Sequence, residues 1–194
     1  NQTVTSSEFT ILPGAATELR ITTAPSTTEA DQSMTMTGEL LPTQPVVALY
    51  DYDGNLVTTT NSGSATIRVK SGAGGSLSSG QTTASFVGGI ATFTGVKLVG
   101  TPGVDYVLEF TNTNPSLTSA GTSVLQVDHN VATHISLTQA AANGKSGDIF
   151  ATQPVIRVLD RYNNLVTSGP GSDASVTVQA AITAQNGVAL TTPA

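Results

Sequence analysis

The sequence predicts an all-β protein built from tandem two-sheet β-sandwich modules. Three observations indicate this fold: short Val, Ile, Leu and Phe runs are bounded by Gly, Pro, Asn and Ser, turn residues recur at about 8 to 12 residues, and one long segment occurs twice. Sustained helical periodicity is missing, since even "TQAAANGKSGD" is interrupted at Asn143-Gly144. We therefore expect almost no helix.

The internal repeat is the strongest feature of the chain. The segment "QPVVALYDYDGNLVT", which begins at Gln44, recurs as "QPVIRVLDRYNNLVT" from Gln153, an offset of 153 − 44 = 109 residues. Upstream, "ATELRIT" from Ala16 recurs as "ATHISLT" from Ala132, an offset of 132 − 16 = 116 residues. The two offsets differ because the first copy has a longer loop around "TTAPSTTEADQ". Repetition of this kind predicts modular architecture.

The repeat also predicts where modules begin and end. At the offset of 116, Phe9-Thr10-Ile11 falls on Leu125-Gln126-Val127, the strand that closes the first copy. We therefore expect residues 1–14 to be the last strand of a preceding module plus a junction, and residues 15–128 to form one complete module. Residues 129–194 form the first part of a second, incomplete module, whose remaining strands we expect beyond Ala194.

Strands of the complete module are predicted from apolar alternation and turn residues. They are Glu18 to Thr22, Ser33 to Glu39, Pro45 to Tyr50, Asn55 to Thr58, Ala65 to Lys70, Thr82 to Val87, Ile90 to Val99, Val104 to Thr111 and Thr122 to Val127. In "GVDYVLEF", alternate residues from Val104 to Phe110 share a buried face, whereas Asp105 and Glu109 lie on a solvated face. The other predicted core residues are Val47, Leu49, Phe86, Phe93, Ile67, Val69, Ile21 and Leu125.

Composition excludes several classes of partner. The net charge is −6 and the seven Lys and Arg residues are scattered, so we expect no nucleic-acid binding, which requires clustered cations. No apolar run approaches the roughly 18 residues of a membrane helix, so we expect no direct membrane insertion. A Thr-, Ser- and Gly-rich, Lys-poor β sequence is typical of exported bacterial surface proteins. We therefore expect an extracellular, cell-surface location.

The stretch "DYDGN" has two interpretations. Asp51, Asp53 and Asn55 alternate as oxygen-bearing residues do in a calcium loop, and Gly54 lies between them. In the second copy Asp53 becomes Tyr162 and the glycine becomes Asn163, so one carboxylate is lost while residues that tolerate positive φ are kept. The comparison favours a β-turn without a metal or other cofactor, and calcium remains the alternative.

Other residues give no catalytic constellation. His134 is predicted to face solvent on a strand, without Cys or acidic residues at ligand spacing, and His129 lies at the expected junction. No Gly-x-Ser-x-Gly elbow or His-Asp pair indicates nucleophilic catalysis. We therefore expect no enzymatic activity and no catalytic or cofactor-binding residues.

The segments "PVVALYDYDGNLV" and "GGIATFTGVKLVGTPGVDYVLEF" resemble the bacterial immunoglobulin-like tandem repeats of the invasin and intimin kind. The resemblance covers the complete module and the available part of the next. It implies immunoglobulin-like sandwiches that serve as a stalk of an adhesin or as a surface-layer array, with neighbouring modules and copies of the same chain as partners. The alternative is an accessory carbohydrate-binding or spacer module of a secreted enzyme.

Overall fold

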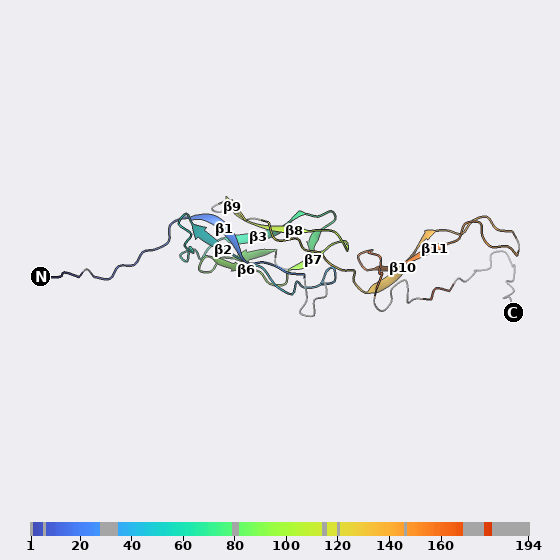
Figure 1. Cartoon of the computed structure of the whole chain (residues 1–194), viewed down its shortest axis with the longest axis horizontal. Coiled ribbons are helices and arrows are strands. Elements are labelled where there is room, and N and C mark those ends of the chain that lie inside the picture. The colour runs from blue at the N-terminus through green and yellow to red at the C-terminus, as the bar shows by residue number, and fades with distance from the viewer. Residues whose placement is uncertain are drawn as a thin grey trace. The chain divides into compact units, whose positions relative to one another are not determined.

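The computed structural model describes residues 2–5, 7–27, 35–78, 82–113, 116–119, 121–145, 147–168 and 177–179. In these ranges every regular element is a β-strand, and all strand pairs are antiparallel (Figure 1). No helix among them is long and apolar enough to cross a membrane. The predicted all-β class is confirmed. The chain divides into two compact units, Asn1–Asn130 and Val131–Ala194.

The first sheet of the first unit has three strands in the order β1-β2-β6. The strands are β1 (Ala16–Thr23), β2 (Val46–Asp51) and β6 (Ile90–Thr92). Across β1 and β2, Leu19 pairs with Leu49 and Ile21 with Val47. Because directly opposed residues of paired strands point to the same face, these four apolar side chains form one apolar surface.

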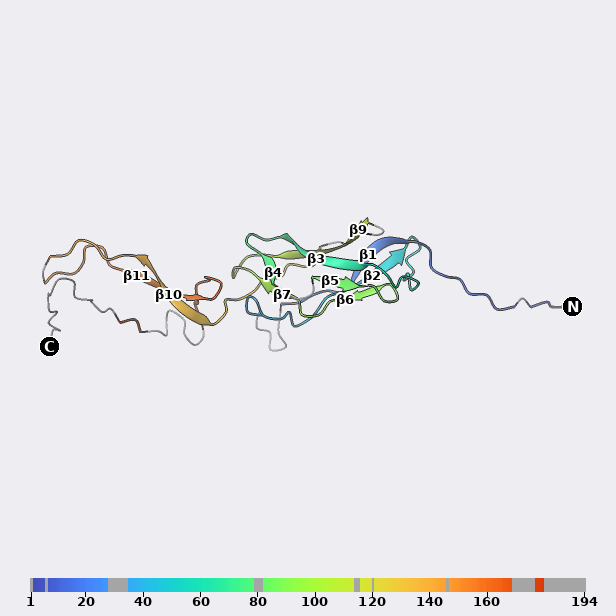
Figure 2. The same cartoon turned by 180° about the vertical axis from the view of Figure 1, so that it is seen from behind.

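The second sheet has four strands in the order β5-β3-β8-β9. The strands are β3 (Ser64–Ser71), β5 (Thr83–Ser85), β8 (Val107–Thr113) and β9 (Ser116–Thr118). Across β3 and β8, Ile67 pairs with Phe110 and Val69 with Leu108. A separate pair of short strands, β4 (Ser76–Ser78) and β7 (Lys97–Val99), completes the unit (Figure 2).

The core of the first unit is shared by its two main sheets. Leu19 and Val47 of the first sheet belong to the same buried cluster as Ile67 and Phe110 of the second. The rings of Phe93 and Phe110 pack with centroids 5.3 Å apart at 56°, a favourable tilted geometry. This is a sandwich-like arrangement, as predicted. The predicted core residues are buried or partly buried in this cluster: Val47, Leu49, Phe86, Phe93, Ile67, Val69, Ile21, Val104, Tyr106, Leu108, Phe110 and Leu125.

Several predicted strands are interrupted. The predicted strand Ile90 to Val99 is two strands, β6 and β7, because the chain bends at Gly95, whose φ is +74°. The prediction for Asn55 to Thr58 is reduced to a single bridge at Leu56, and that for Thr122 to Val127 to a single bridge at Leu125. Both segments nevertheless keep backbone hydrogen bonds to their neighbours.

The predicted strand Ser33 to Glu39 is wrong in its described part. Ser33 and Met34 lie outside the described residues. From Thr35 onward the chain makes one bridge, between Met36 and Asp128, and then turns at Gly38, where φ is +79°. The short strands β4 and β9 were not predicted, because three residues are too few for polar–apolar alternation to indicate a strand.

The second unit contains an antiparallel pair of strands, β10 (Ala132–Gln139) and β11 (Val155–Asp160). Ile135 pairs with Val158 and Leu137 with Ile156. The β1–β2 pair has the same register at the equivalent positions, and its irregularities fall at the same two places. The sequence repeat is therefore also a repeat of strand pairing.

Tyr106 is held in the first unit by a cradle of glycines. A Cβ atom added at Gly72, Gly75 or Gly100 would lie within 2.2 to 2.6 Å of the ring, closer than real Cβ contacts allow. The ring is fully buried, and its hydroxyl accepts a 2.7 Å hydrogen bond from the backbone N–H of Thr101. The glycines are thus required by close approach of an aromatic ring.

We predict that Gly100→Ala destabilises the first unit by about 1 to 3 kcal/mol, because the buried ring cannot move away from the added methyl group. Gly14→Ala is the matched control, since the nearest atom to its Cβ would lie at an ordinary 3.6 Å. Urea denaturation of the two variants measures the difference. Equal stability of the two variants would contradict the cradle.

Candidate functional site

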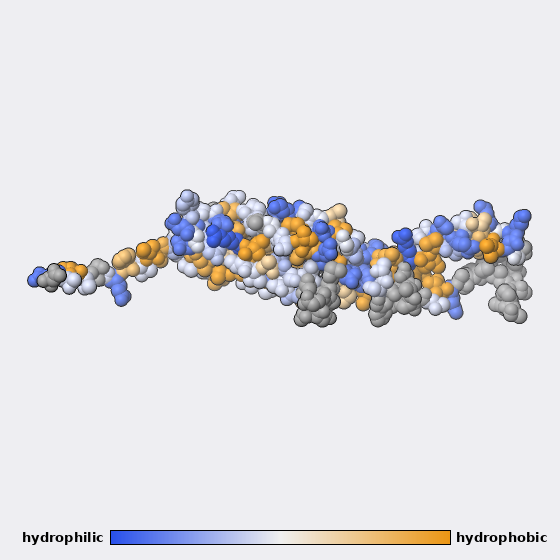
Figure 3. Space-filling model, viewed as in Figure 1, coloured by the Kyte–Doolittle hydropathy of each residue, from blue (hydrophilic) through white to orange (hydrophobic). Residues whose placement is uncertain are grey.

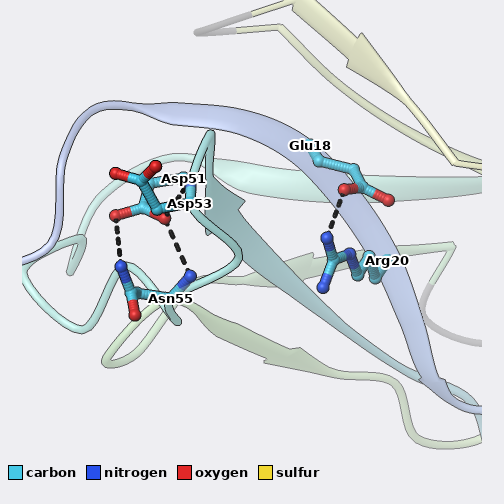
Figure 4. Close-up of polar contacts among 5 residues, drawn as sticks. All are labelled: Glu18, Arg20, Asp51, Asp53 and Asn55. Atoms are coloured by element: carbon cyan, nitrogen blue, oxygen red, sulfur yellow. Dashed lines mark hydrogen bonds and ion pairs between the residues drawn. The ribbon is translucent and has the colours of Figure 1, made fainter.

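The corner that follows β2 is built around the Asp51 carboxylate (Figure 4). Its Oδ1 atom accepts hydrogen bonds from the backbone N–H groups of Asp53 (3.1 Å) and Asn55 (2.8 Å). Its Oδ2 atom accepts from the side-chain amide of Asn55 (3.2 Å) and from the backbone N–H of Gly14 (2.9 Å). Little of Asp51 is exposed, and four N–H donors stabilise its carboxylate.

The backbone of the corner is closed by two further hydrogen bonds. The N–H of Asp51 donates to the carbonyl of Asn55 (2.9 Å), and the N–H of Gly54 donates to the carbonyl of Asp51 (3.1 Å). Gly54 has a φ of +80°, which a residue without a Cβ adopts at little cost. These bonds explain why the sequence places Asp, Gly and Asn at this spacing.

The corner also shifts the ionisation of Asp51. The backbone N–H of Asn55, followed by that of Gly14, holds the pKa of Asp51 below its usual range, because both donors stabilise the charged form. Nearby, Arg20 lies 2.6 Å from Glu18 and its hydrogen bond lowers the pKa of Glu18 (Figure 4). That second pair is solvent-exposed and contributes little to stability.

The second unit contains the same corner. Asp160 Oδ1 accepts from the backbone N–H groups of Tyr162 (2.8 Å) and Asn164 (2.9 Å), and Oδ2 accepts from the Asn164 side chain (3.1 Å). Asn163 replaces the glycine and has a φ of +65°. Asn is one of the few side chains that tolerate this conformation. The shared feature of the two copies is the carboxylate with its N–H donors.

This geometry bears directly on the calcium alternative. Calcium requires six to eight oxygen ligands, whereas both oxygens of Asp51 are already occupied by N–H donors. The other two candidate calcium ligands serve the corner as donors. Asp53 donates its backbone N–H, and Asn55 donates its backbone N–H and its side-chain amide. Over the described ranges no cluster of three or more His, Cys, Asp or Glu side chains could hold a metal ion. The arrangement favours a structural corner.

The prediction that Glu109 lies on a solvated face is wrong. Its side chain is buried, with Oε1 lying 2.6 Å from Nη2 of Arg68 and Oε2 3.7 Å from Nζ of Lys70. Arg68 lies directly opposite Glu109 in the β3–β8 pair. The long aliphatic stems of Arg68 and Lys70 can cover a carboxylate while their charged ends stay in water. Asp105, in contrast, is exposed and accepts a hydrogen bond from Gln126.

The two histidines lie in different surroundings. His134 is exposed on β10, as predicted, and its ring nitrogens lie 3.0 Å from the Thr133 hydroxyl and 3.2 Å from Oδ1 of Asn163. His129 is buried in the first unit, with Nδ1 lying 3.0 Å from the Asn130 carbonyl. Both rings therefore contact ordinary polar groups of the protein.

The four tyrosines do not form a row of stacking surfaces. Tyr106 is fully buried, and the guanidinium of Arg20 lies over the ring of Tyr50 at 4.4 Å. Arg161 lies similarly over Tyr162 at 4.9 Å. Tyr52 is exposed at the corner of the first unit. A pyranose ring would find one uncovered tyrosine there, whereas sugar-binding surfaces use several aromatic rings.

An open groove of about 380 Å³ lies along β1. It is lined by Glu18, Leu19, Arg20, Ile21, Ala24, Gly121, Thr122 and Ser123. Its polar groups are mainly the exposed Glu18–Arg20 pair and two hydroxyls, which do not form a constellation for catalysis. The groove does show that the segment preceding Leu125 lies beside β1.

Comparison with known proteins identified no matching family model, no similar curated protein and no similar solved structure.

We predict that Asp51→Ala lowers the melting temperature of the chain by roughly 5 °C or more, since it removes the charged acceptor of four hydrogen bonds that close the corner. Asp53→Ala is the matched control and should change stability by no more than about 0.5 kcal/mol, because it keeps the donating backbone N–H. Both results should be unchanged by a chelator. Calcium-dependent melting that disappears in Asp53→Ala would establish the metal alternative.

We also predict an acid-sensitive contribution from Asp51. Because its pKa is lower in the folded chain than in the unfolded chain, its stabilisation is complete above the unfolded value of about 3.9 and is lost as pH falls through the folded value. Melting curves from neutral to strongly acidic pH should show a steeper loss in the wild type than in Asp51→Asn. Glu18 titrates in both proteins, so parallel curves would contradict the assignment to Asp51.

Proposed function

We propose that the chain is a segment of tandem immunoglobulin-like β-sandwich modules in a large extracellular bacterial surface protein. Residues 15–128 form one module, and residues 129–194 are the first part of the next. The modules act as a stalk or as a surface-layer array, and their role is structural or adhesive rather than catalytic. Neighbouring modules of the same chain are the partners.

One observation carries this proposal: both units contain the same carboxylate-held corner and the same strand register. A further pair of equivalent contacts supports it, since the side-chain amide of Gln44 donates to the Leu41 carbonyl and that of Gln153 donates to the Phe150 carbonyl. Side-chain hydrogen bonds that recur in both units and have backbone groups as their partners are what a repeated scaffold requires. A catalytic or binding site would instead direct polar groups towards a ligand.

The surface supports a scaffold over a carbohydrate-binding module. Arg20 covers the ring of Tyr50, and Arg161 covers the ring of Tyr162. Tyr106 is buried in the core. The shortest ion pairs of the described residues join Glu18 to Arg20 and Glu109 to Arg68. These groups stabilise sheet surfaces and leave few fixed polar groups for ligand recognition.

Small-angle scattering of a chain with several consecutive modules tests this function. A tandem array joined by short linkers should give an elongated profile whose longest dimension rises in proportion to the number of modules. A glycan array measured with the same protein should give no specific binding. A compact profile of constant length would contradict the array, and saturable sugar binding would favour the accessory-module alternative.

A further inference from the structure

The first unit ends in a segment that is bonded to a loop far away in the sequence. Asp128 forms a bridge with Met36, the only parallel pairing among the described residues. The backbone N–H of Asp128 donates to the carbonyl of Thr35 (3.0 Å), and its carbonyl accepts from the N–H of Thr37 (2.7 Å). The chain passes into the second unit at Val131, so these bonds hold the point at which it leaves the first.

Asn130, the last residue of the first unit, adds a side-chain contact to the same loop. Its Nδ2 atom donates to the carbonyl of Thr37 (3.0 Å) and to Oε1 of Glu39 (3.3 Å). Asn130 and Thr37 are 4% and 0% exposed, beneath a surface on which hydrophilic and hydrophobic residues are mixed (Figure 3). Water therefore has little access to compete for these bonds. We call residues 35–39 and 128–130 the clasp.

The loop of the clasp is itself anchored to the body of the unit. The N–H of Gly38 donates to the carbonyl of Leu98 in β7 (2.8 Å). The hydroxyl of Thr37 accepts a buried hydrogen bond from the N–H of Gly100 (2.8 Å). A pull on residues 128–130 is thus passed through the loop to β7 and the residue that follows it.

The anchoring loop belongs to the repeated part of the sequence. Thr37-Gly38-Glu39 corresponds to Ser146-Gly147-Asp148 at the offset of 109, so the hydroxyl, the glycine and the carboxylate are all kept. Gly38 and Gly147 also have similar φ values, +79° and +88°. The residues that build the clasp loop are therefore a feature of each copy of the repeat.

We propose that the clasp is the contact by which the first unit resists tension applied along the chain. The inference rests on the proposed tandem function, because a stalk or an array transmits force from module to module through its chain. Tension on Val131 acts along residues 128–130, whereas their four hydrogen bonds to the loop run sideways from this segment. Bonds arranged in this way carry the force together and do not open one after another.

Stretching single molecules of the full chain in two directions tests the inference. The sequence contains no cysteine, so two introduced cysteines define the points at which force is applied. Leu12→Cys and Val131→Cys, both at exposed positions, apply it along the chain and through the clasp. Tyr52→Cys and Val87→Cys, also at exposed positions, apply it to the first unit at two points outside the clasp.

Asn130→Ala should accelerate unfolding along the chain by about fivefold at a given force, the change expected when one buried hydrogen bond must break before the unit opens. The same variant should change unfolding in the second direction much less, because the clasp then carries no force. Equal acceleration in both directions would show an ordinary stabilising contact and would overturn the inference. No acceleration along the chain would also overturn it.

Two further variants complete the experiment. Asn61→Ala is the matched control, since Asn61 Oδ1 accepts a 2.7 Å hydrogen bond from the N–H of Gly88 outside the clasp, and it should show no dependence on direction. Thr37→Val removes the acceptor of the Gly100 N–H and should reproduce the directional effect of Asn130→Ala, which keeps the test decisive if that variant does not fold. The rates belong to one unit, so their failure leaves the scattering of the array unchanged, and a compact array profile leaves the rates unchanged.

Discussion

The Asp51 carboxylate and its four N–H donors set the geometry on which the first unit depends. The carboxylate, at the end of β2, accepts a hydrogen bond from Gly14, which lies just before β1. It also accepts one from Asn55, where the chain turns back after β2. The start of β1 and the end of β2 are thereby held together at one end of the strand pair. This contact fixes the register of β1 and β2. The register decides whether Leu19 and Val47 face the core or solvent, because a shift by one residue moves every side chain to the other face of the sheet.

The turn part of this arrangement recurs in the second unit, where Asp160 takes the place of Asp51. The chain there tolerates Asn163 instead of glycine and Tyr162 instead of an acidic residue. The corner therefore depends on the carboxylate and the positive-φ residue rather than on the intervening side chains. The two units thus share this corner and the same strand register.

Much of this architecture could be predicted from the sequence repeat. The hydrophobic pattern and the turn residues that recur each lie within a short stretch of the chain, so they can be recognised without knowing long-range contacts. The face shared by Tyr106, Leu108 and Phe110 followed from strict alternation and is confirmed. Burial of Glu109 could not be predicted, since it depends on Arg68, a cross-strand neighbour about forty residues away in sequence. The break at Gly95 was missed because a glycine within an apolar run does not reveal its φ.

In both units backbone and side-chain N–H donors, rather than a metal, hold the corner carboxylate. Amide hydrogen exchange measured by nuclear magnetic resonance tests it at the backbone N–H groups of Asp53, Asn55, Tyr162 and Asn164. We expect all four amides to be protected in the presence of a chelator and unaffected by excess calcium. Rapid exchange in chelator, with protection appearing only on addition of calcium, would contradict the account.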